Sequence, residues 1–171
     1  MSASHAVQAL AYYSPGTFSD QTRLSPRLIF LESYINAVGV KPGKPSSSVD
    51  FKRFYMPNSI FHNADGVDYV GNETISNWIH ALFGPLSYLD HEIKSILEVQ
   101  FGGHDSEPTR WKLYVDTKRV LALKSWGPDV QKTVPFHAVF TVERWDAGEH
   151  SHGISEISIH WDTEVLRSGP K

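Results

Sequence analysis

The side chains able to do chemistry in this 171-residue sequence are histidines and carboxylates. There are nine His and nineteen Asp and Glu residues but no Cys, which excludes a thiolate nucleophile, a thiolate metal site and a disulfide framework. The sequence also lacks a nucleophile-elbow serine, a phosphate-binding glycine loop and a dinucleotide-binding fingerprint. Any catalysis is therefore expected to be proton transfer by His and carboxylate, with neither metal nor organic cofactor.

The last apolar run of the sequence carries a His and an Asp two residues apart. Side chains alternate between the faces of a strand, so His160 and Asp162 share one face, whereas Ile157, Ile159 and Trp161 share the other. A carboxylate in an apolar pocket has a raised pKa, which suits it to proton transfer near neutral pH. Alternation does not decide which face lines a pocket. Asp162 is therefore a candidate acid/base or a strand cap, and Trp161 a candidate pocket wall.

Two further histidines lie on expected strands. His137 occupies the apolar run 136–140, where a His is more often a hydrogen-bonded core residue than a catalyst. His62 lies on an expected hairpin strand and could form an acid–base couple with Asp162, its alternative being an exposed edge position. Both are kept as catalytic candidates.

A third group of histidines has the spacing of a metal motif. His150, His152 and Glu156 resemble the first metal motif of cupins, in which two His and one carboxylate bind a metal. Arg144 and Thr163 stand where that motif has glycines, and no second motif follows. No metal site is predicted.

Aromatic side chains are the candidates for substrate contact. Trp111 and Tyr114 lie three apart on an expected strand and so face opposite sides, and one of them should line the interior. A Tyr hydroxyl could donate a hydrogen bond to a developing enolate oxygen, and Tyr34 on the first helix could do the same if it faces inward. Trp78 belongs to an apolar helical stripe and is either a core residue or a pocket wall.

Helices and a hairpin must position these residues in the first half of the chain. The first helix is expected to begin after Ser25, which is followed by Pro and by apolar residues at helical spacing, and to end at Gly39. An Asp-Gly pair between two apolar runs predicts a hairpin over residues 59–70. Asn72 is the expected cap of a second helix that ends at Gly84.

Extended runs dominate the second half. Four segments rich in Val, Ile, Phe, Trp and Thr are separated by turn residues, and they cover residues 91–101, 110–124, 133–145 and 154–166. Helices ahead of a mostly antiparallel meander indicate an α+β fold, in which a curved, cone-shaped sheet wraps around the N-terminal helices. The interior of such a cone is a natural apolar pocket.

Length and composition indicate one domain, large enough for one sizeable core or one ligand cavity. The segment 1–21 is expected to be an irregular arm, and residues 22–171 a single α+β domain. A formal net charge of −3 gives no support for nucleic-acid or anionic-membrane binding. The sequence has neither a basic signal-peptide start nor an apolar run of about 20 residues, so a cytoplasmic location is expected.

Four local strings, over residues 50–55, 59–63, 69–78 and 157–163, occur in an order that resembles a known family. They are similar to the SnoaL-like, polyketide cyclase-like branch of the nuclear transport factor 2-like superfamily, over roughly residues 28–166. The resemblance implies an α+β barrel and assigns an acid/base role to Asp162, because the cyclases carry such an Asp on the terminal strand. It also implies an oxyanion-donor role for Tyr34, as in ketosteroid isomerases.

This resemblance implies two alternative functions. The first is a cofactor-independent isomerase, cyclase or dehydratase acting on a hydrophobic oxygenated intermediate of polyketide or terpenoid type. The second is a non-catalytic small-molecule-binding or dimerisation module of the same fold. A homodimer formed through the convex face of the sheet is expected in either case.

Overall fold

A seven-stranded sheet in the order β1-β4-β5-β6-β7-β2-β3 organises the described part of the chain. The computed structural model describes residues 9–13, 18–20, 22–42, 48–101, 109–127 and 129–166. The strands are β1 (Ala9–Tyr13), β2 (Tyr55–His62), β3 (Asp68–Val70), β4 (Leu86–Phe101), β5 (Arg110–Leu123), β6 (Lys132–Arg144) and β7 (His152–Trp161). The expected meander corresponds to β4 through β7, and the expected hairpin to β2 and β3.

Two α-helices form where their start signals predict them. Helix α1 (Pro26–Val38) is capped by Ser25, whose Oγ accepts a hydrogen bond from the backbone N–H of Leu28 at 3.4 Å. Helix α2 (Asn72–Phe83) begins one residue earlier than expected, because Gly71 is its cap and Asn72 is already helical. Gly71 has a φ of +89°, a conformation that glycine adopts without steric strain. Neither α-helix of the described residues is long and apolar enough to cross a lipid bilayer.

The segment expected to be an irregular arm contains a strand. Ala9–Tyr13 form β1 and pair antiparallel with residues 95–99 of β4. The unpaired N–H and C=O groups along the edge of a long strand provide a template for such pairing. Apart from residues 18–20, the rest of the segment 1–21 lies outside the described residues.

The last strand makes the sheet mixed. β7 pairs antiparallel with β6 on one side and parallel with β2 on the other. It ends at Trp161, earlier than the run 154–166 predicts, and residues Thr163–Leu166 form the 3-10 helix η4. The reason is local, since Asp162 Oδ1 accepts a hydrogen bond from the backbone N–H of Glu164 at 2.9 Å, a turn arrangement that competes with strand pairing.

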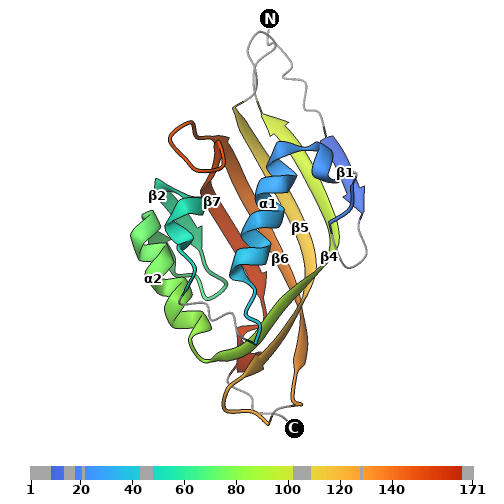
Figure 1. The fold of residues 1–171 in the computed structure, drawn as a ribbon, viewed down its shortest axis with the longest axis vertical. Coiled ribbons are helices and arrows are strands. Elements are labelled where there is room, and N and C mark those ends of the chain that lie inside the picture. The colour runs from blue at the N-terminus through green and yellow to red at the C-terminus, as the bar shows by residue number, and fades with distance from the viewer. Residues whose placement is uncertain are drawn as a thin grey trace, which may run out of the picture.

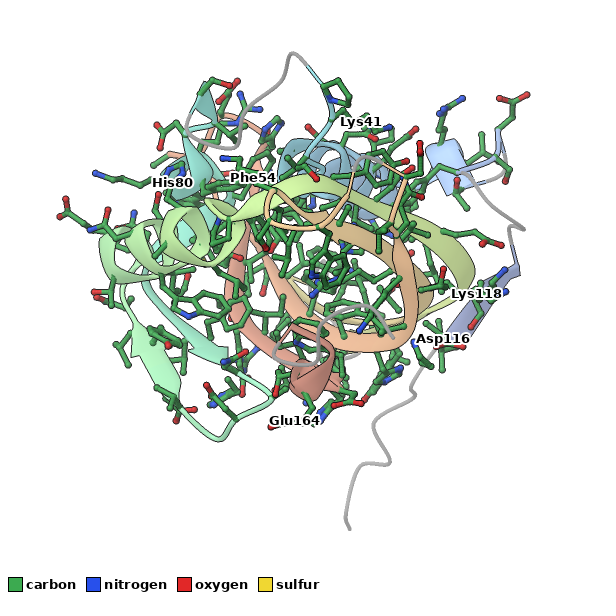
Figure 2. The ribbon with its side chains drawn as sticks, turned by 90° about the horizontal axis from the view of Figure 1, so that it is seen from below. Lys41, Phe54, His80, Asp116, Lys118 and Glu164 are labelled. Atoms are coloured by element: carbon green, nitrogen blue, oxygen red, sulfur yellow. The ribbon has the colours of Figure 1, made fainter. Side chains whose placement is uncertain are left out.

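The curved sheet encloses α1 on its concave side. Figure 1 shows α1 lying across β5 and β6, with α2 beside β2 at the other end of the sheet. A short 3-10 helix, η3 (Phe51–Phe54), packs against α2 and leads into β2. In the end-on view of Figure 2 the strands curve around an interior filled by side chains, while Asp116 and Lys118 of β5 point outward. The expected cone-shaped α+β fold is confirmed.

Candidate functional site

An apolar cavity lies between the two α-helices and the concave face of the sheet. Its walls come from α1, α2, β2 and the central strands, with Ile35, Ile79, Phe140 and Ile157 among the contributing side chains. The centre of a water-sized sphere can occupy about 40 Å³ of it, and the total empty space, including its open mouth, is about 530 Å³. Since a water molecule needs about 10–15 Å³ by the first measure, the cavity has room for about three waters or a ligand with a small apolar body.

Four polar side chains also line this cavity, namely Tyr34, His91, Thr117 and Arg119. Two of them come from β5, where alternation sends Thr117 and Arg119 inward and their neighbours Asp116 and Lys118 outward (Figure 2). His91 comes from the adjacent strand β4 and Tyr34 from α1. The cavity therefore combines apolar walls with a small number of convergent polar groups, the composition of a small-molecule site.

Arg119 is a buried cation without a carboxylate partner among the described residues. Arg119 is only 6% exposed, and its Nε donates a hydrogen bond to Nε2 of His91 at 3.1 Å. The guanidinium carbon lies 3.7 Å from the ring centroid of Phe136 and 4.8 Å from that of Trp161. Burial lowers the pKa of Arg119 to about 9, with a smaller opposing effect from Tyr34, so the group remains cationic at neutral pH.

His91 is the neutral neighbour of this cation. Burial and the nearby charge of Arg119 hold the pKa of His91 well below its usual value. Because Nε2 accepts from Arg119, the proton of the neutral ring is on Nδ1. Within the described part of the chain, Nδ1 of His91 and Oγ1 of Thr117 are buried and have no hydrogen-bond partner. Such groups are uncommon in folded proteins and call for an explanation.

Tyr34, which lines the cavity, forms a hydrogen-bonded pair with a second tyrosine, Tyr55. The hydroxyl oxygens of Tyr34 and Tyr55 are 2.7 Å apart and buried. Burial raises the pKa of Tyr34 to about 12, even though the hydrogen bond with Tyr55 and the charge of Arg119 act in the opposite direction. Burial also raises the pKa of Tyr55. With Tyr55 as donor to Tyr34, the proton of Tyr34 is free for a ligand in the cavity.

Comparison with known proteins establishes the architecture. No family model and no curated protein sequence match the chain, but solved structures do. A protein of Shewanella denitrificans OS-217 described as a SnoaL-like polyketide cyclase is 12% identical, with a TM-score of 0.52 over 87% of this chain and 96% of that one. A ketosteroid isomerase-like protein of Erwinia carotovora atroseptica is 11% identical, with a TM-score of 0.54 over 85% and 99%.

Nuclear transport factor 2 of Cryptosporidium parvum has the same architecture. It is 15% identical, with a TM-score of 0.55 over 88% of this chain and 100% of that one. The chain has the nuclear transport factor 2-like fold. The resemblance inferred from the order of its sequence strings is thereby confirmed at the level of the fold.

In this protein the expected acid–base residues lie outside the cavity. Ile157 and Ile159 of β7 line it, so His160 points to the outer face and is exposed. Asp162 follows the end of β7, is exposed, and caps the start of η4. His137 pairs with His160 in register on that outer face, with ring centroids 6.3 Å apart. The structure therefore brings His137 and His160 together, away from the cavity.

His62 also lies on the outer face of the sheet. Its Nδ1 is 2.7 Å from Oδ1 of Asp68 and its Nε2 is 3.2 Å from Oε1 of Glu156. The hydrogen bond to Asp68 is the main cause of a raised His62 pKa. The hydrogen-bond partners of His62 are therefore Asp68 and Glu156 rather than Asp162, so the expected couple of His62 with Asp162 does not form.

The predicted aromatic contacts divide between the cavity and other places. Tyr34 and Trp78 line the cavity, and Trp161 covers one face of Arg119 and lines a smaller neighbouring cavity. Trp111 faces the interior but packs elsewhere, 4.8 Å from the guanidinium of Arg27. Tyr114 is half-buried on the opposite face of β5, so Trp111 is the inward member of this pair.

The side chains with cupin-like spacing do not converge on one point. His150 stacks on Phe54 with a centroid distance of 5.4 Å, and His152 lies 5.7 Å from the ring of Trp111. Glu156 instead contacts His62. Across the described ranges no three His, Asp or Glu side chains converge as metal ligands.

Sequence reasoning missed His91, Thr117 and Arg119. A signal for two of them was present, because alternation places Thr117 and Arg119 on the same strand face as the apolar Val115 and Leu121. An Arg on the buried face of a strand is rare unless it is paired, which would have marked it as a candidate. His91 gave no comparable signal, since it stands at the expected start of a strand.

The low pKa of His91 predicts a pH dependence of stability. The unfolded chain protonates this His as pH falls below about 6.5, whereas the folded protein keeps it neutral. The unfolded state then binds more protons, so stability is full above about pH 6.5 and is lost as pH falls. In His91→Gln, whose amide oxygen can still accept from Arg119, we expect a shallower loss, by up to about 1.4 kcal/mol per pH unit.

Urea unfolding between pH 7.5 and 5 measures this difference. The pKa of His152 is lowered as well and that of His62 is raised, so the comparison of wild type with His91→Gln, rather than the wild-type curve alone, isolates His91. Parallel curves for the two proteins would contradict a neutral buried His91.

Proposed function

We propose that this protein is a cofactor-independent enzyme that transfers protons on a small hydrophobic oxygenated substrate, as an isomerase, cyclase or dehydratase. The observation that carries the proposal is the hydroxyl of Tyr34, which lines the wall of an apolar cavity and is hydrogen-bonded to the hydroxyl of Tyr55. A hydrogen-bond donor held in a water-poor site stabilises negative charge as it develops on a substrate oxygen. The fold shared with cyclase-like and isomerase-like proteins supports this proposal.

In the proposed mechanism a substrate carbonyl oxygen accepts a hydrogen bond from Tyr34. Tyr55 orients Tyr34 and strengthens its donation by donating to it in turn. The Nδ1–H of neutral His91 is a second donor, whose ring is held by Arg119 through Nε2. As the substrate enolises, these donors stabilise the enolate oxygen and keep their own protons, while the proton that leaves the substrate carbon passes to a water molecule at the open mouth of the cavity and is returned from it to the product carbon. The net result is relocation of a substrate proton.

A non-catalytic binding module is the second candidate function. One observation favours it: the described side chains that line the cavity include no carboxylate that could act as a strong base. Asp162 would supply one in the family mechanism that the sequence resembles, but its carboxylate is exposed and caps η4. The expected homodimer remains a prediction for both functions.

Turnover of a small unsaturated ketone tests the enzyme proposal. Cyclohex-3-enone isomerises to its conjugated isomer through an enolate, and the conjugated product is followed by ultraviolet absorbance. Removing one oxyanion donor lowers catalysis by about 10²–10³-fold, so we expect Tyr34→Phe to lose about 100-fold in kcat. Asp162→Asn is the matched control and should retain the wild-type rate.

Each outcome of this assay decides between named alternatives. Full activity of Tyr34→Phe would exclude Tyr34 as the oxyanion donor. Loss of activity in folded Asp162→Asn would show that Asp162, rather than Tyr34, is the main candidate for the catalytic residue. If the wild-type protein binds the ketone, as measured by calorimetry, but does not accelerate its isomerisation, the binding module is the better description.

A further inference from the structure

The buried charge of Arg119 lacks its counter-charge within the described protein. A cation taken out of water is strongly disfavoured unless an opposite charge and hydrogen bonds compensate for it. Arg119 is 6% exposed, and its one hydrogen bond among the described residues joins it to neutral His91. Arg27, which is half-buried, has the usual solution, because buried Glu98 pairs with it at 2.6 Å.

The surroundings of Arg119 leave one edge of its guanidinium available. The rings of Phe136 and Trp161 lie within 5 Å of its carbon atom, and Nε is occupied by His91. The free groups are the two terminal nitrogens, Nη1 and Nη2. Together they form a two-pronged donor edge that matches the two oxygens of one carboxylate.

The neighbouring unpartnered groups are also hydrogen-bond donors. Nδ1–H of His91 and the hydroxyl of Thr117 are buried without partners among the described residues, and both line the same cavity as Arg119 and Tyr34. A carboxylate accepts hydrogen bonds on both oxygens and has about four lone-pair positions. One anionic group would therefore satisfy Arg119 and at least one of these orphaned donors.

We propose that the cavity binds a substrate through its carboxylate group, with Arg119 as the anchor and His91 or Thr117 as a second donor. This inference deepens the proposed function, since it names the substrate class of the same cavity. The remaining walls are apolar, so the rest of the ligand is a hydrophobic ring or chain. A single guanidinium offsets a monoanion, which favours a carboxylate over a doubly charged phosphate.

Calorimetric titration with benzoate and with its neutral analogue benzamide tests this inference. A hydrogen bond to a charged group contributes about 1.5–3 kcal/mol, so benzoate should bind about 10- to 100-fold more tightly than benzamide. Arg119→Met should weaken benzoate binding by a similar factor. Lys118→Met, which removes an outward-pointing cation from the adjacent position of β5 (Figure 2), should leave binding unchanged.

Three results would overturn the inference: equal affinities for benzoate and benzamide, unchanged benzoate binding in folded Arg119→Met, or tighter binding of inorganic phosphate than of benzoate. Absence of binding by benzoate, cyclohexanecarboxylate and acetate alike would overturn it as well. If Arg119→Met proves unfolded, Arg119→Lys is measured in its place. This variant keeps the charge without the two-pronged edge and should bind benzoate with an affinity between that of the wild type and no binding. Failure here is distinguishable from failure of the proposed function, because the ketone assay depends on Tyr34 and uses a neutral substrate.

Discussion

Replacing Arg119 with methionine should make the folded protein more stable. Arg119 is 6% exposed and its pKa is lowered to about 9 by burial, so keeping the group charged inside the protein at pH 7 opposes folding. Apolar replacement of whole buried ion pairs is often neutral or stabilises proteins by about 1–4 kcal/mol, and an unpaired buried charge lacks even the attraction of a partner. Loss of the hydrogen bond leaves Nε2 of His91 unpaired, which offsets part of the gain.

The net effect expected for Arg119→Met is a melting temperature higher by about 2–10 °C, given about 2–4 °C per kcal/mol for a chain of this size. Differential scanning calorimetry at pH 7 measures it, with Lys118→Met as the control for removing a surface charge from the same strand. Saturating benzoate should raise the melting temperature of the wild type more than that of the variant. A lower melting temperature for Arg119→Met without ligand would show that Arg119 has a structural role instead.

Replacing Arg27 with methionine should have the opposite and larger effect. Glu98 is 3% exposed, and Arg27 compensates its charge through Nε at 2.7 Å and Nη2 at 2.6 Å. Removing one partner of such a pair leaves an uncompensated buried charge and costs about 3–5 kcal/mol. Ser25 remains as a hydrogen-bond donor to Glu98 at 3.1 Å, but its hydroxyl is neutral.

The melting temperature of Arg27→Met should therefore fall by about 6–15 °C. The control is Arg23→Met, because Arg23 makes a comparably short contact with Glu32, at 2.7 Å, with its own side chain 52% exposed. An exposed pair contributes about 0–1 kcal/mol. Equal shifts in the two variants would contradict the burial argument, and a restored melting temperature in the Arg27→Met, Glu98→Met double variant would support it.

The melting temperature is expected to rise in Arg119→Met and to fall in Arg27→Met, and this difference distinguishes a functional from a structural role of the two arginines. Arg27 is held by Glu98, its counter-charge within the chain. Arg119 has no such pair among the described residues, and the ligand carboxylate that we propose for the cavity would supply its counter-charge. A residue that destabilises the empty protein and improves ligand binding is the expected signature of a site under functional constraint.

Much of the architecture could be predicted because its signals are local. Ser25 and the following Pro mark the start of α1, and the Asp-Gly pair marks the β2–β3 hairpin. The strand at Ala9–Tyr13 could not be found in the same way, because what specifies it is the free edge of β4, about 85 residues further along the chain. The placement of Asn72 was wrong by one residue, a shift within the ordinary uncertainty of helix ends.

The candidate site was harder to predict than the fold. Composition directs attention to the histidines, and the place of Tyr34 on the first helix makes it a candidate donor. Alternation alone left the two faces of β7 equivalent, and the inward face is the one with Ile157 and Ile159. Asp162 therefore faces solvent in the turn that follows. Among the described residues that line the cavity the charged side chain is Arg119, and its lack of an ion-pair partner in the described ranges is visible only once the residues around it are placed.

The parallel pairing of β7 with β2 has a consequence for synthesis on the ribosome. His62 of β2 pairs with Ser158 of β7. About 95 further residues must therefore be synthesised after β2 before it can pair with β7. Ile157 and Ile159 of that last strand also close one wall of the cavity. Pairing of such distant segments slows folding, and an incomplete chain exposes the apolar wall and the edge of β6. We therefore expect the proposed ligand site to be incomplete until β7 has emerged from the ribosome, so that a ligand binds only chains in which β7 is already in place.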